Sequence, residues 1–559
     1  MNNKHRIISF VAVILGFFMA LLDTTIVNIT LPKITDYFNS TMTHISWVVN
    51  VYNLVFASMI ITASRLADQF GRKKLFIFGV LLFTICSIFS GLSNSVGMLV
   101  TFRALQGLSA AFVVPVTVPL SAEIFPPEKR GPIMALWGAF AGLAAASGPS
   151  LGGILTQFFS WRAIFFINIP IGILCVLMTK YFIKESYDPT ADKNIDVAGI
   201  LSISTAMFSL IFALIKGNDK GWTSPFIITL FILSAIAVLL FIIIELKSKK
   251  PMIPLSLFKI VPFSSGAIAL FLLGLGMMSG SYFLSFFLIQ VKGLTQLSAG
   301  LVVSSMSVSS MFFSMLSAAL SKRISSRWIS SMGLCLLALS CLLYSTLTQN
   351  STTLGIILRL VVAGSGMGLS MSTLMNSMVK NVPPTKIGIS SGINNMTRTL
   401  GTFLGVAVFL SIFTSNIKVQ MVDAKRAAVK IVKADTVFNN EAKTGMINSL
   451  KQGNGSKFSD VSSILKTIAV KEKATLKAAP IRAKAEIKHN FAVQRKETKK
   501  LYPLIQDTFK TYTVHAFSFT FKCASLILLP GILFAFFSDT KKKSKSSAEN
   551  SYSEGTEVS

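Results

Sequence analysis

Charged side chains are scarce in this sequence. Of its 559 residues, 14% are Asp, Glu, Lys or Arg and 52% are hydrophobic, and the mean hydropathy is +0.64. Soluble chains of similar length carry about 25% charged residues. The scarcity argues against a soluble protein and predicts an all-α polytopic membrane protein.

Sequence signals of several other functions are also missing. The five cysteines all fall within apolar runs, without the spacing of metal ligands or of a disulfide framework. No Gly-x-x-x-x-Gly-Lys-Ser/Thr loop is present, so we do not expect ATP to supply energy. The net charge of +30 comes without a recognisable nucleic-acid fold, and anionic lipid headgroups are the simpler partner. We therefore expect no enzyme, no metal, no cofactor and no nucleic acid.

Apolar runs long enough to cross a membrane recur along the whole chain. A window of about 19 residues separates fourteen predicted spans, each near the ~20 residues that a membrane-crossing helix needs. These spans cover residues 7–30, 45–64, 75–93, 98–121, 132–156, 162–183, 197–215, 224–245, 263–289, 297–319, 328–348, 353–373, 390–414 and 516–537. An even number of spans places both termini on one side of the membrane.

The positions of the basic residues predict on which side of the membrane the termini lie. The loops 65–74, 245–251 and 321–327 are rich in Lys and Arg, whereas the intervening loops 93–97 and 157–161 contain neither. Basic loops of membrane proteins remain in the cytoplasm. We therefore expect a multi-pass protein of a bacterial plasma membrane with both termini in the cytoplasm.

One long basic segment, residues 415–515, falls on the outer side by this alternation. Loops longer than about 60 residues are largely exempt from the charge rule, so the topology is unaffected. Ala, Lys, Glu and spaced apolar residues around a Gly-Asn-Gly turn at 453–455 favour two or three amphipathic helices, arranged as a hairpin on the outer surface. A disordered basic loop is the alternative on composition.

A weak internal repeat relates the two ends of the chain. Arg72 and Arg103 are separated by nearly the same distance as Arg327 and Arg359, and each pair joins a basic loop to the second span after it. Two homologous six-helix bundles with an inserted helix pair would explain the repeat. The predicted divisions are a first bundle (1–190), the inserted pair (191–255), five helices of a second bundle (256–414), the basic extracellular loop (415–515), the last span (516–537) and a disordered cytoplasmic tail (538–559).

Asp23 and Arg103 are charged residues inside predicted spans. Asp23 belongs to "LLDTTIVNITLP", and Arg103 to "LVTFRALQGLSAA", where Gln106 follows one turn later. Charged residues in membrane spans are costly and usually face the interior or a water-filled cavity. Burial favours the neutral form of a carboxylic acid, whereas a nearby cation favours the ionised form. A carboxylate balanced between these two influences can bind and release a proton. We therefore expect Asp23 and Arg103 to couple protons to transport.

Local explanations exist for both residues. Asp23 could hydrogen-bond to Thr24, Thr25 or Asn28 and only shape its helix. Arg103 lies within about two turns of the end of its span, so its side chain could reach the outer headgroups instead.

The loop "SRLADQFGRKKL" places an acid, a glycine and three consecutive bases in a short turn. Asp68 can cap the next helix or pair with a base, and Gly71 permits the turn. The loop resembles the signature of the major facilitator superfamily, whose Gly-x-Leu-x-Asp-Arg-x-Gly-Arg-Lys pattern latches the inward gate. Asp68, Gly71, Arg72 and Lys73 match it, as does the leucine before the acid. Ser64 stands where the pattern has glycine, and Gln69 stands where it has arginine.

Other strings extend the resemblance over essentially the whole chain. Arg103 to Gly107 is similar to the superfamily's span-4 motif associated with proton coupling. The run Gly148, Pro149, Ser150, Leu151, Gly152 and Gly153 resembles the antiporter motif of its exporters, although helix packing alone also favours small residues at this spacing. "LDTTIVNITLP" and "WRAIFFINIPIG" resemble the 14-span drug:proton antiporters of the EmrB/QacA type. The resemblance implies the major facilitator fold, with two six-helix bundles and two inserted helices.

The substrate is less constrained. The resemblance implies that exporters of lipophilic cations carry further acids in spans 10 or 13. Here neither predicted span contains an acid, and span 13 carries Arg398, which disfavours a dicationic substrate and leaves neutral, zwitterionic or anionic amphipaths. Candidate substrate-cavity residues are Asn28, Gln106, Met277, Met311 and Arg398, although the methionines are as easily packing residues.

These observations lead to a proton-coupled multidrug exporter that works by alternating access, as a monomer, with the proton gradient as its energy source. Its partners would be small amphipathic substrates, protons and the lipid bilayer. An exporter or flippase of an endogenous lipid or envelope precursor is the alternative. A non-transporting sensor or scaffold is disfavoured, because it would need no charged groups inside apolar spans.

Overall fold

A computed structural model describes residues 3–40, 42–126, 130–187, 196–248, 255–321, 323–380, 386–435 and 484–539, with isolated residues between these ranges. All regular structure in these residues is helical. The helices before residue 190 are α1 (Asn3–Tyr37), α2 (Met42–Ile45), α3 (Trp47–Phe70), α4 (Arg72–Gly91), α5 (Val96–Val113), α6 (Thr117–Ile124), α7 (Arg130–Phe158), α8 (Ala163–Phe166) and α9 (Asn168–Phe182). Those after it are α10 (Val197–Lys220), α11 (Pro225–Lys247), η2 (Leu255–Lys259), α12 (Val261–Met278), the π-helix η3 (Ser279–Phe283), α13 (Leu284–Gln290), α14 (Gln296–Leu320), α15 (Ser326–Tyr344), α16 (Thr353–Lys380), α17 (Ile387–Ala434) and α20 (Lys484–Phe536).

Thirteen helices within the described residues are long and apolar enough to cross a membrane. The prediction of an all-α polytopic membrane protein is therefore confirmed. The span predicted at 132–156 corresponds to the 29-residue helix α7, which is not among these thirteen, so the count of fourteen stays a prediction. The span predicted at 98–121 is divided into α5 and α6, with Pro115 between them, because proline cannot donate the next helical hydrogen bond.

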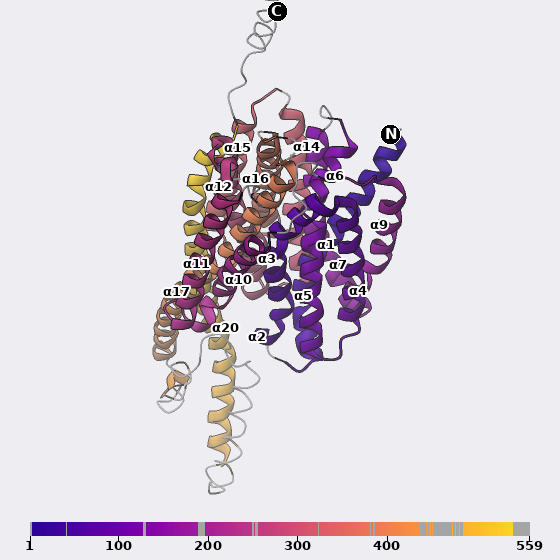
Figure 1. The fold of residues 1–559 in the computed structure, drawn as a ribbon. Coiled ribbons are helices and arrows are strands. Elements are labelled where there is room, and N and C mark those ends of the chain that lie inside the picture. Colours follow the sequence, from indigo (N-terminus) through magenta and orange to yellow (C-terminus); the bar gives the residue numbers. More distant parts are fainter. Residues whose placement is uncertain are drawn as a thin grey trace, which may run out of the picture.

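The helices before residue 190 pack on one another (Figure 1). Helix α1 packs on α7 and α9, and α5 packs on α3 and α4. Among the later helices, α16 packs on α14 and α15, and α17 packs on α12 and α20. The two groups meet where α7 packs on α14 and where α3 packs on α17. The pair α10 and α11 joins the bundle through contacts of α10 with α3 and α17.

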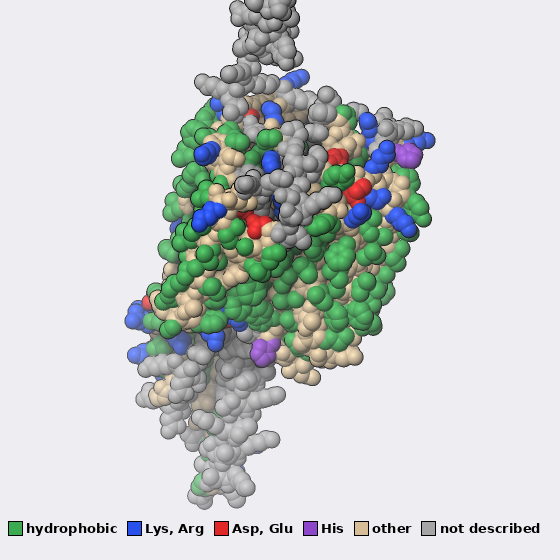
Figure 2. Space-filling model, in the orientation of Figure 1, with side chains coloured by type: hydrophobic (Ala, Val, Ile, Leu, Met, Phe, Trp, Pro, Cys, Tyr) green, Lys and Arg blue, Asp and Glu red, His purple; other side chains and the backbone are tan. Residues whose placement is uncertain are grey.

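The surface of the bundle is apolar around its middle and charged towards its ends (Figure 2). Helix α11 shows the reason, because a row of large apolar residues on it is exposed: Ile228, Ile232, Ile236, Leu239 and Ile243. An exposed apolar surface of this extent suits lipid, not water.

Helices α17 and α20 continue well into the segment 415–515. The spans predicted to end at residue 414 and to begin at residue 516 are parts of longer helices, since α17 runs to Ala434 and α20 starts at Lys484. Their extensions share a small apolar core of their own, formed by Ala424, Ala428, Val432, Leu450, Ile505 and Phe509. We call residues 415–434 and 484–515 the hairpin. The turn predicted at 453–455 and the tail from residue 540 lie outside the described residues.

The hairpin lies at one end of the molecule. In Figure 1, α1 begins and α20 ends at the opposite end of the bundle, and the first part of α20 extends beyond the other helices. Helix α20 therefore carries ordered structure away from the apolar bundle.

Candidate functional site

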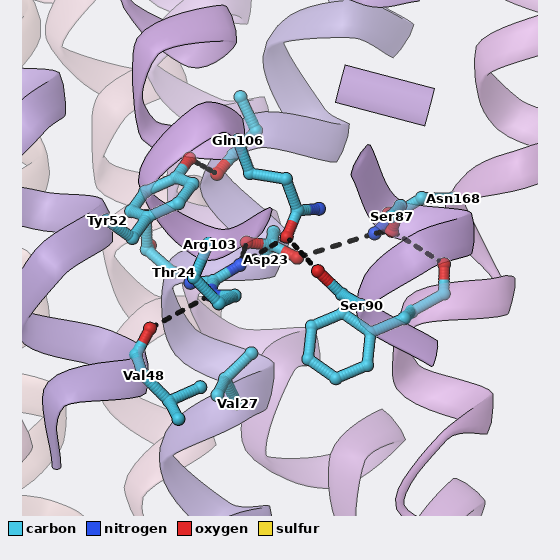
Figure 3. Close-up of polar contacts among 12 residues, drawn as sticks. Asp23, Thr24, Val27, Val48, Tyr52, Ser87, Ser90, Arg103, Gln106 and Asn168 are labelled. Atoms are coloured by element: carbon cyan, nitrogen blue, oxygen red, sulfur yellow. Dashed lines mark hydrogen bonds and ion pairs between the residues drawn. The ribbon is translucent and has the colours of Figure 1, made fainter. Parts of the chain in front are cut away.

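Asp23 and Arg103 form an ion pair in the interior of the first helix group (Figure 3). Asp23 comes from the middle of α1 and Arg103 from α5, and both side chains have no exposed surface. Each partner compensates the charge of the other, since an isolated charge at this depth would be very costly. Neither local explanation from the sequence holds for this arrangement: Arg103 points inward, and Asp23 bonds across to another helix.

Other groups fix the position of the Arg103 guanidinium. Its Nε donates to the Val48 carbonyl oxygen at 2.9 Å, and its Nη1 donates to Gln106 Oε1 at 3.1 Å. Its Cζ lies 4.3 Å from the centre of the Tyr52 ring, a cation–π geometry. Tyr52 is itself held on α1 by a hydrogen bond of 3.1 Å to the Ala20 carbonyl. Helices α1, α3 and α5 therefore meet at this pair.

The network extends to α4 and α9 through residues that the sequence analysis did not select. Asn168 Nδ2 lies 3.4 Å from Asp23 Oδ1 and 3.0 Å from Ser87 Oγ. Ser90 Oγ donates to Gln106 Oε1 at 3.2 Å. All of these polar residues are buried. Asn168 lies inside "WRAIFFINIPIG", and a single amide in an apolar run is a sequence feature that could have marked it as a candidate site residue.

Three polar atoms of this network have no hydrogen-bond partner within the described part of the chain. They are Arg103 Nη2, Gln106 Nε2 and Asn168 Oδ1. Unsatisfied buried polar atoms are rare because each carries a desolvation penalty of about 1–3 kcal/mol. Their concentration around Asp23 leaves hydrogen-bonding capacity that a different protonation state, a water molecule or a substrate group can use.

Glycines bring the helices of the site into close contact. A Cβ atom at Gly107 would overlap the Tyr52 carbonyl, so α5 approaches the backbone of α3 one residue after Gln106. A Cβ atom at Gly148 would overlap Thr25 Oγ1, and one at Gly152 would lie 2.8 Å from the Ile26 carbonyl. The antiporter-motif glycines of α7 therefore contact α1 directly after Asp23. Helix α7 continues through Pro149, and Gly152 and Gly153 are both buried.

The loop between α3 and α4 forms a second charged site. Arg72 is buried and bonds Asp68 Oδ1 at 2.8 Å and Glu123 Oε1 at 2.6 Å. Asp68 thus pairs with a base, which was one of its two expected uses. The cap of α4 comes instead from Glu185, whose carboxylate accepts from the backbone N–H groups of Lys73 at 2.9 Å and Lys74 at 3.2 Å.

Glu123 and Glu185 were not predicted, because they lie far from the loop in sequence and nothing in their local sequence indicates a link to it. Gly71 has φ +113°, a conformation that side chains rarely adopt, which explains the glycine. Ser64, which departs from the family pattern, lies where α3 packs on α17, and Gly392 of α17 faces it. The small residue at this crossing is therefore supplied by the opposite helix.

The candidate substrate-cavity residues are not gathered in one place. Gln106 belongs to the Asp23–Arg103 network, whereas Asn28 is exposed and donates to the Thr24 carbonyl of its own helix at 2.9 Å. Met277 and Met311 are half-buried on α12 and α14.

Arg398 lies on a polar face of α17. Ser391, Asn395 and Arg398 follow one another at helical spacing, and Ser391 Oγ donates to the Pro115 carbonyl between α5 and α6 at 3.2 Å. This face is therefore directed at the first helix group. Arg398 Nε, Asn395 Oδ1 and both amide atoms of the buried Asn394 have no partner in the described residues. Unlike Arg103, Arg398 has no acidic partner in that part of the chain.

The fold and its buried charge pair define a multi-pass membrane protein built of two helix groups, with paired charges in the first. A family model described as Major Facilitator Superfamily matches residues 13–406. The chain belongs to this superfamily, which confirms that part of the predicted resemblance and identifies it as a membrane transporter.

Three relatives illustrate the similarity. The chain is 31% identical over 406 residues to the tetracenomycin C resistance and export protein of Streptomyces glaucescens, covering 73% of this chain and 76% of the relative. It is 32% identical over 414 residues to the multidrug resistance protein Stp of Mycobacterium tuberculosis, covering 74% and 77%. It is 30% identical over 403 residues to multidrug resistance protein 3 of Bacillus subtilis, covering 72% and 78%. The chain therefore has resistance and export proteins among its relatives.

Proposed function

We propose that this protein is a proton-coupled exporter of amphipathic toxic compounds, of the 14-span drug:proton antiporter type. The observation that carries the proposal is the buried ion pair between Asp23 on α1 and Arg103 on α5. The names of the relatives, which include resistance and export proteins, support the direction of transport and the substrate class.

The pair provides a way to couple proton binding to movement. When a proton adds to the Asp23 carboxylate, the acid becomes neutral and its attraction to Arg103 is lost. The guanidinium then has an uncompensated charge in a low-dielectric interior, which favours a rearrangement that gives it a new partner. Because the two residues come from different helices, this rearrangement changes how α1 sits against α5. The glycine contacts of α7 with α1 transmit the change, since closely packed backbones move together.

Proton release on the other side of the membrane restores the ion pair. If the protonated and deprotonated forms favour opposite-facing states, a proton gradient drives the cycle in one direction without any covalent step. The loop held by Arg72, Asp68 and Glu123 would stabilise one of these states, because its ion pairs join the ends of α3, α4 and α6. In this proposal both termini are cytoplasmic and one chain is sufficient.

The polar face of α17 is the proposed contact for the substrate. Arg398 and the Asn394 amide offer donors without partners, and the described part of α14 and the first half of α17 contain no acid. Such a face suits carbonyl, phenolate or carboxylate oxygens. We therefore expect neutral, zwitterionic or anionic amphipaths to be transported better than dications.

Transport into or out of proteoliposomes under an imposed pH gradient tests the proposal. A panel of cationic, neutral and anionic amphipaths should show gradient-dependent transport by the wild type. Asp23→Asn should abolish the dependence on the gradient, whereas Asp36→Asn, an exposed acid on the same helix, should not. Coupled transport that survives Asp23→Asn would refute the role of the pair. Movement of lipid, with no transport of the panel, would favour an exporter of a lipid precursor.

The α17 face is tested separately. Arg398→Lys keeps a positive charge and should retain transport of anionic substrates, whereas Arg398→Gln should lower it at least tenfold. Equal effects on neutral and anionic substrates would indicate a structural role for Arg398.

A further inference from the structure

The exposed surface of the hairpin is mostly positively charged. Its exposed basic residues are Lys418, Arg426, Lys430 and Lys433 on α17, and Lys484, Lys488, Lys496, Lys499, Lys500 and Lys510 on α20. Among the described side chains of the hairpin, the exposed acids are Asp423 and Asp507. The family match ends at residue 406, before the hairpin begins. The transport cycle proposed above does not use the charged residues of the hairpin.

The hairpin's own core explains why the lysines face outward. Ala424, Ala428 and Val432 recur every four residues along one face of α17, and Ile505 and Phe509 do so on α20. These faces pack on each other, so the remaining faces of both helices are turned to solvent. The lysines are consequently presented on an ordered scaffold and not on a flexible chain.

Few of these bases are neutralised within the hairpin. Lys500 bonds Glu497 at 2.9 Å, and Arg426 lies 3.4 Å from Asp423. Such exposed pairs contribute little, and most of the positive charge remains available. Lys484, Lys488, Lys496 and Lys499 share one face of α20, at spacings of four, eight and three residues, which gives a line of positive charge instead of a single point.

The position of this charge favours a polymer over the membrane surface. Lys433 stands 19 residues beyond the predicted membrane end of α17 at residue 414, which is about 30 Å of helix at 1.5 Å per residue. Lys488 lies 28 residues before the predicted start of the last span at 516, or about 40 Å. Charge interactions in water are screened over about 8–10 Å at physiological ionic strength. Because the first part of α20 extends away from the bundle (Figure 1), its outer lysines are too far from lipid headgroups to be attracted by them.

We propose that the hairpin binds a linear polyanion, a polymer bearing closely spaced phosphate or carboxylate groups, at the membrane face opposite both termini. A line of lysines along α20, joined by those of α17, matches a repeated negative charge, and binding would release counterions from the polymer. The proposal does not depend on the transport mechanism.

Binding of long-chain inorganic polyphosphate to the full-length protein tests this inference. The protein is placed in nanodiscs of uncharged phosphatidylcholine, so that lipid charge does not contribute. The wild type should bind with an affinity that falls steeply with salt. A variant carrying Lys430→Gln, Lys433→Gln, Lys488→Gln and Lys496→Gln should bind at least tenfold more weakly at physiological salt. The slope of log affinity against log salt should decrease by about 3 if most of these lysines contact phosphates.

A matched control removes the same charge elsewhere. Lys4, Lys184, Lys247 and Lys380 are exposed lysines on helix ends and loops outside the hairpin, and their replacement by Gln should leave polyphosphate binding unchanged. Equal losses in the two variants would overturn the proposal, because binding would then follow total charge. Binding to phosphatidylglycerol vesicles without binding to polyphosphate would also overturn it, in favour of a lipid surface. Circular dichroism checks that both variants keep wild-type helicity.

Discussion

Gly148 of α7 lies so close to Thr25 of α1 that a single added Cβ atom would overlap the threonine hydroxyl. Thr25 is two residues from Asp23, so a close approach of these helices occurs beside the buried charge pair. The packing of α7 on α1 and the proposed proton-binding acid are therefore linked by direct contact.

We expect Gly148→Ala to damage transport and to destabilise the protein by about 1–3 kcal/mol, the usual cost of forcing extra volume into a packed interior. Thermal unfolding and gradient-driven transport measure the two effects. Gly97→Ala is the control, since nothing lies within 4 Å of a Cβ atom added there. If Gly148→Ala behaves like Gly97→Ala, the contact is not tight.

The Asp23–Arg103 pair predicts strong non-additivity. Arg103→Gln alone leaves a buried carboxylate without its cation, and breaking a buried pair in this way costs about 3–5 kcal/mol. Adding Asp23→Asn removes the uncompensated charge, so the double variant should be more stable than Arg103→Gln. Unfolding of both single variants and the double variant completes the cycle. Additive effects would show that the two charges do not interact.

Gly71 predicts a difference between two glycines that both have positive φ. Gly71 has φ +113° and a Cβ atom there would lie 2.7 Å from the Glu185 carboxyl carbon, whereas Gly221 has φ +87° and open space around it. Alanine at either position carries backbone strain of about 1–3 kcal/mol, because both residues have a positive φ that side chains rarely adopt. Only Gly71→Ala should also displace the Glu185 cap and lower transport. Transport rates of the two variants, compared at equal expression, distinguish strain alone from loss of the α4 cap.

The sequence was sufficient for the parts of the fold and site that depend on local pattern. Apolar runs located the helices, and the scarcity of charge made Asp23 and Arg103 conspicuous. The contacts of Asn168 with Asp23 and of Glu185 with Lys73 could not be predicted, because they join residues more than 100 positions apart. For Arg359 the sequence pattern suggested a similarity that the structure does not show. The repeat pairs Arg359 with Arg103, yet Arg359 donates to the Leu343 and Gly355 carbonyls at 3.0 and 2.9 Å at a helix end. The same residue type at a repeated position therefore has a different environment.

The hairpin core predicts contrasting effects for two adjacent residues of α20. Ile505 is fully buried between the helices, whereas the Leu504 side chain is half exposed. Ile505→Asp places a charge inside a small apolar core, which should open the hairpin, because a buried unpaired charge costs more than a core of this size provides. Leu504→Asp should have little effect. Hydrogen exchange of residues 421–432 should rise at least tenfold in Ile505→Asp only, with exchange in α1 and α5 unchanged. Equal protection in both variants would mean that the two extensions do not depend on each other, and the lysines would then lack the ordered scaffold on which polyanion binding rests.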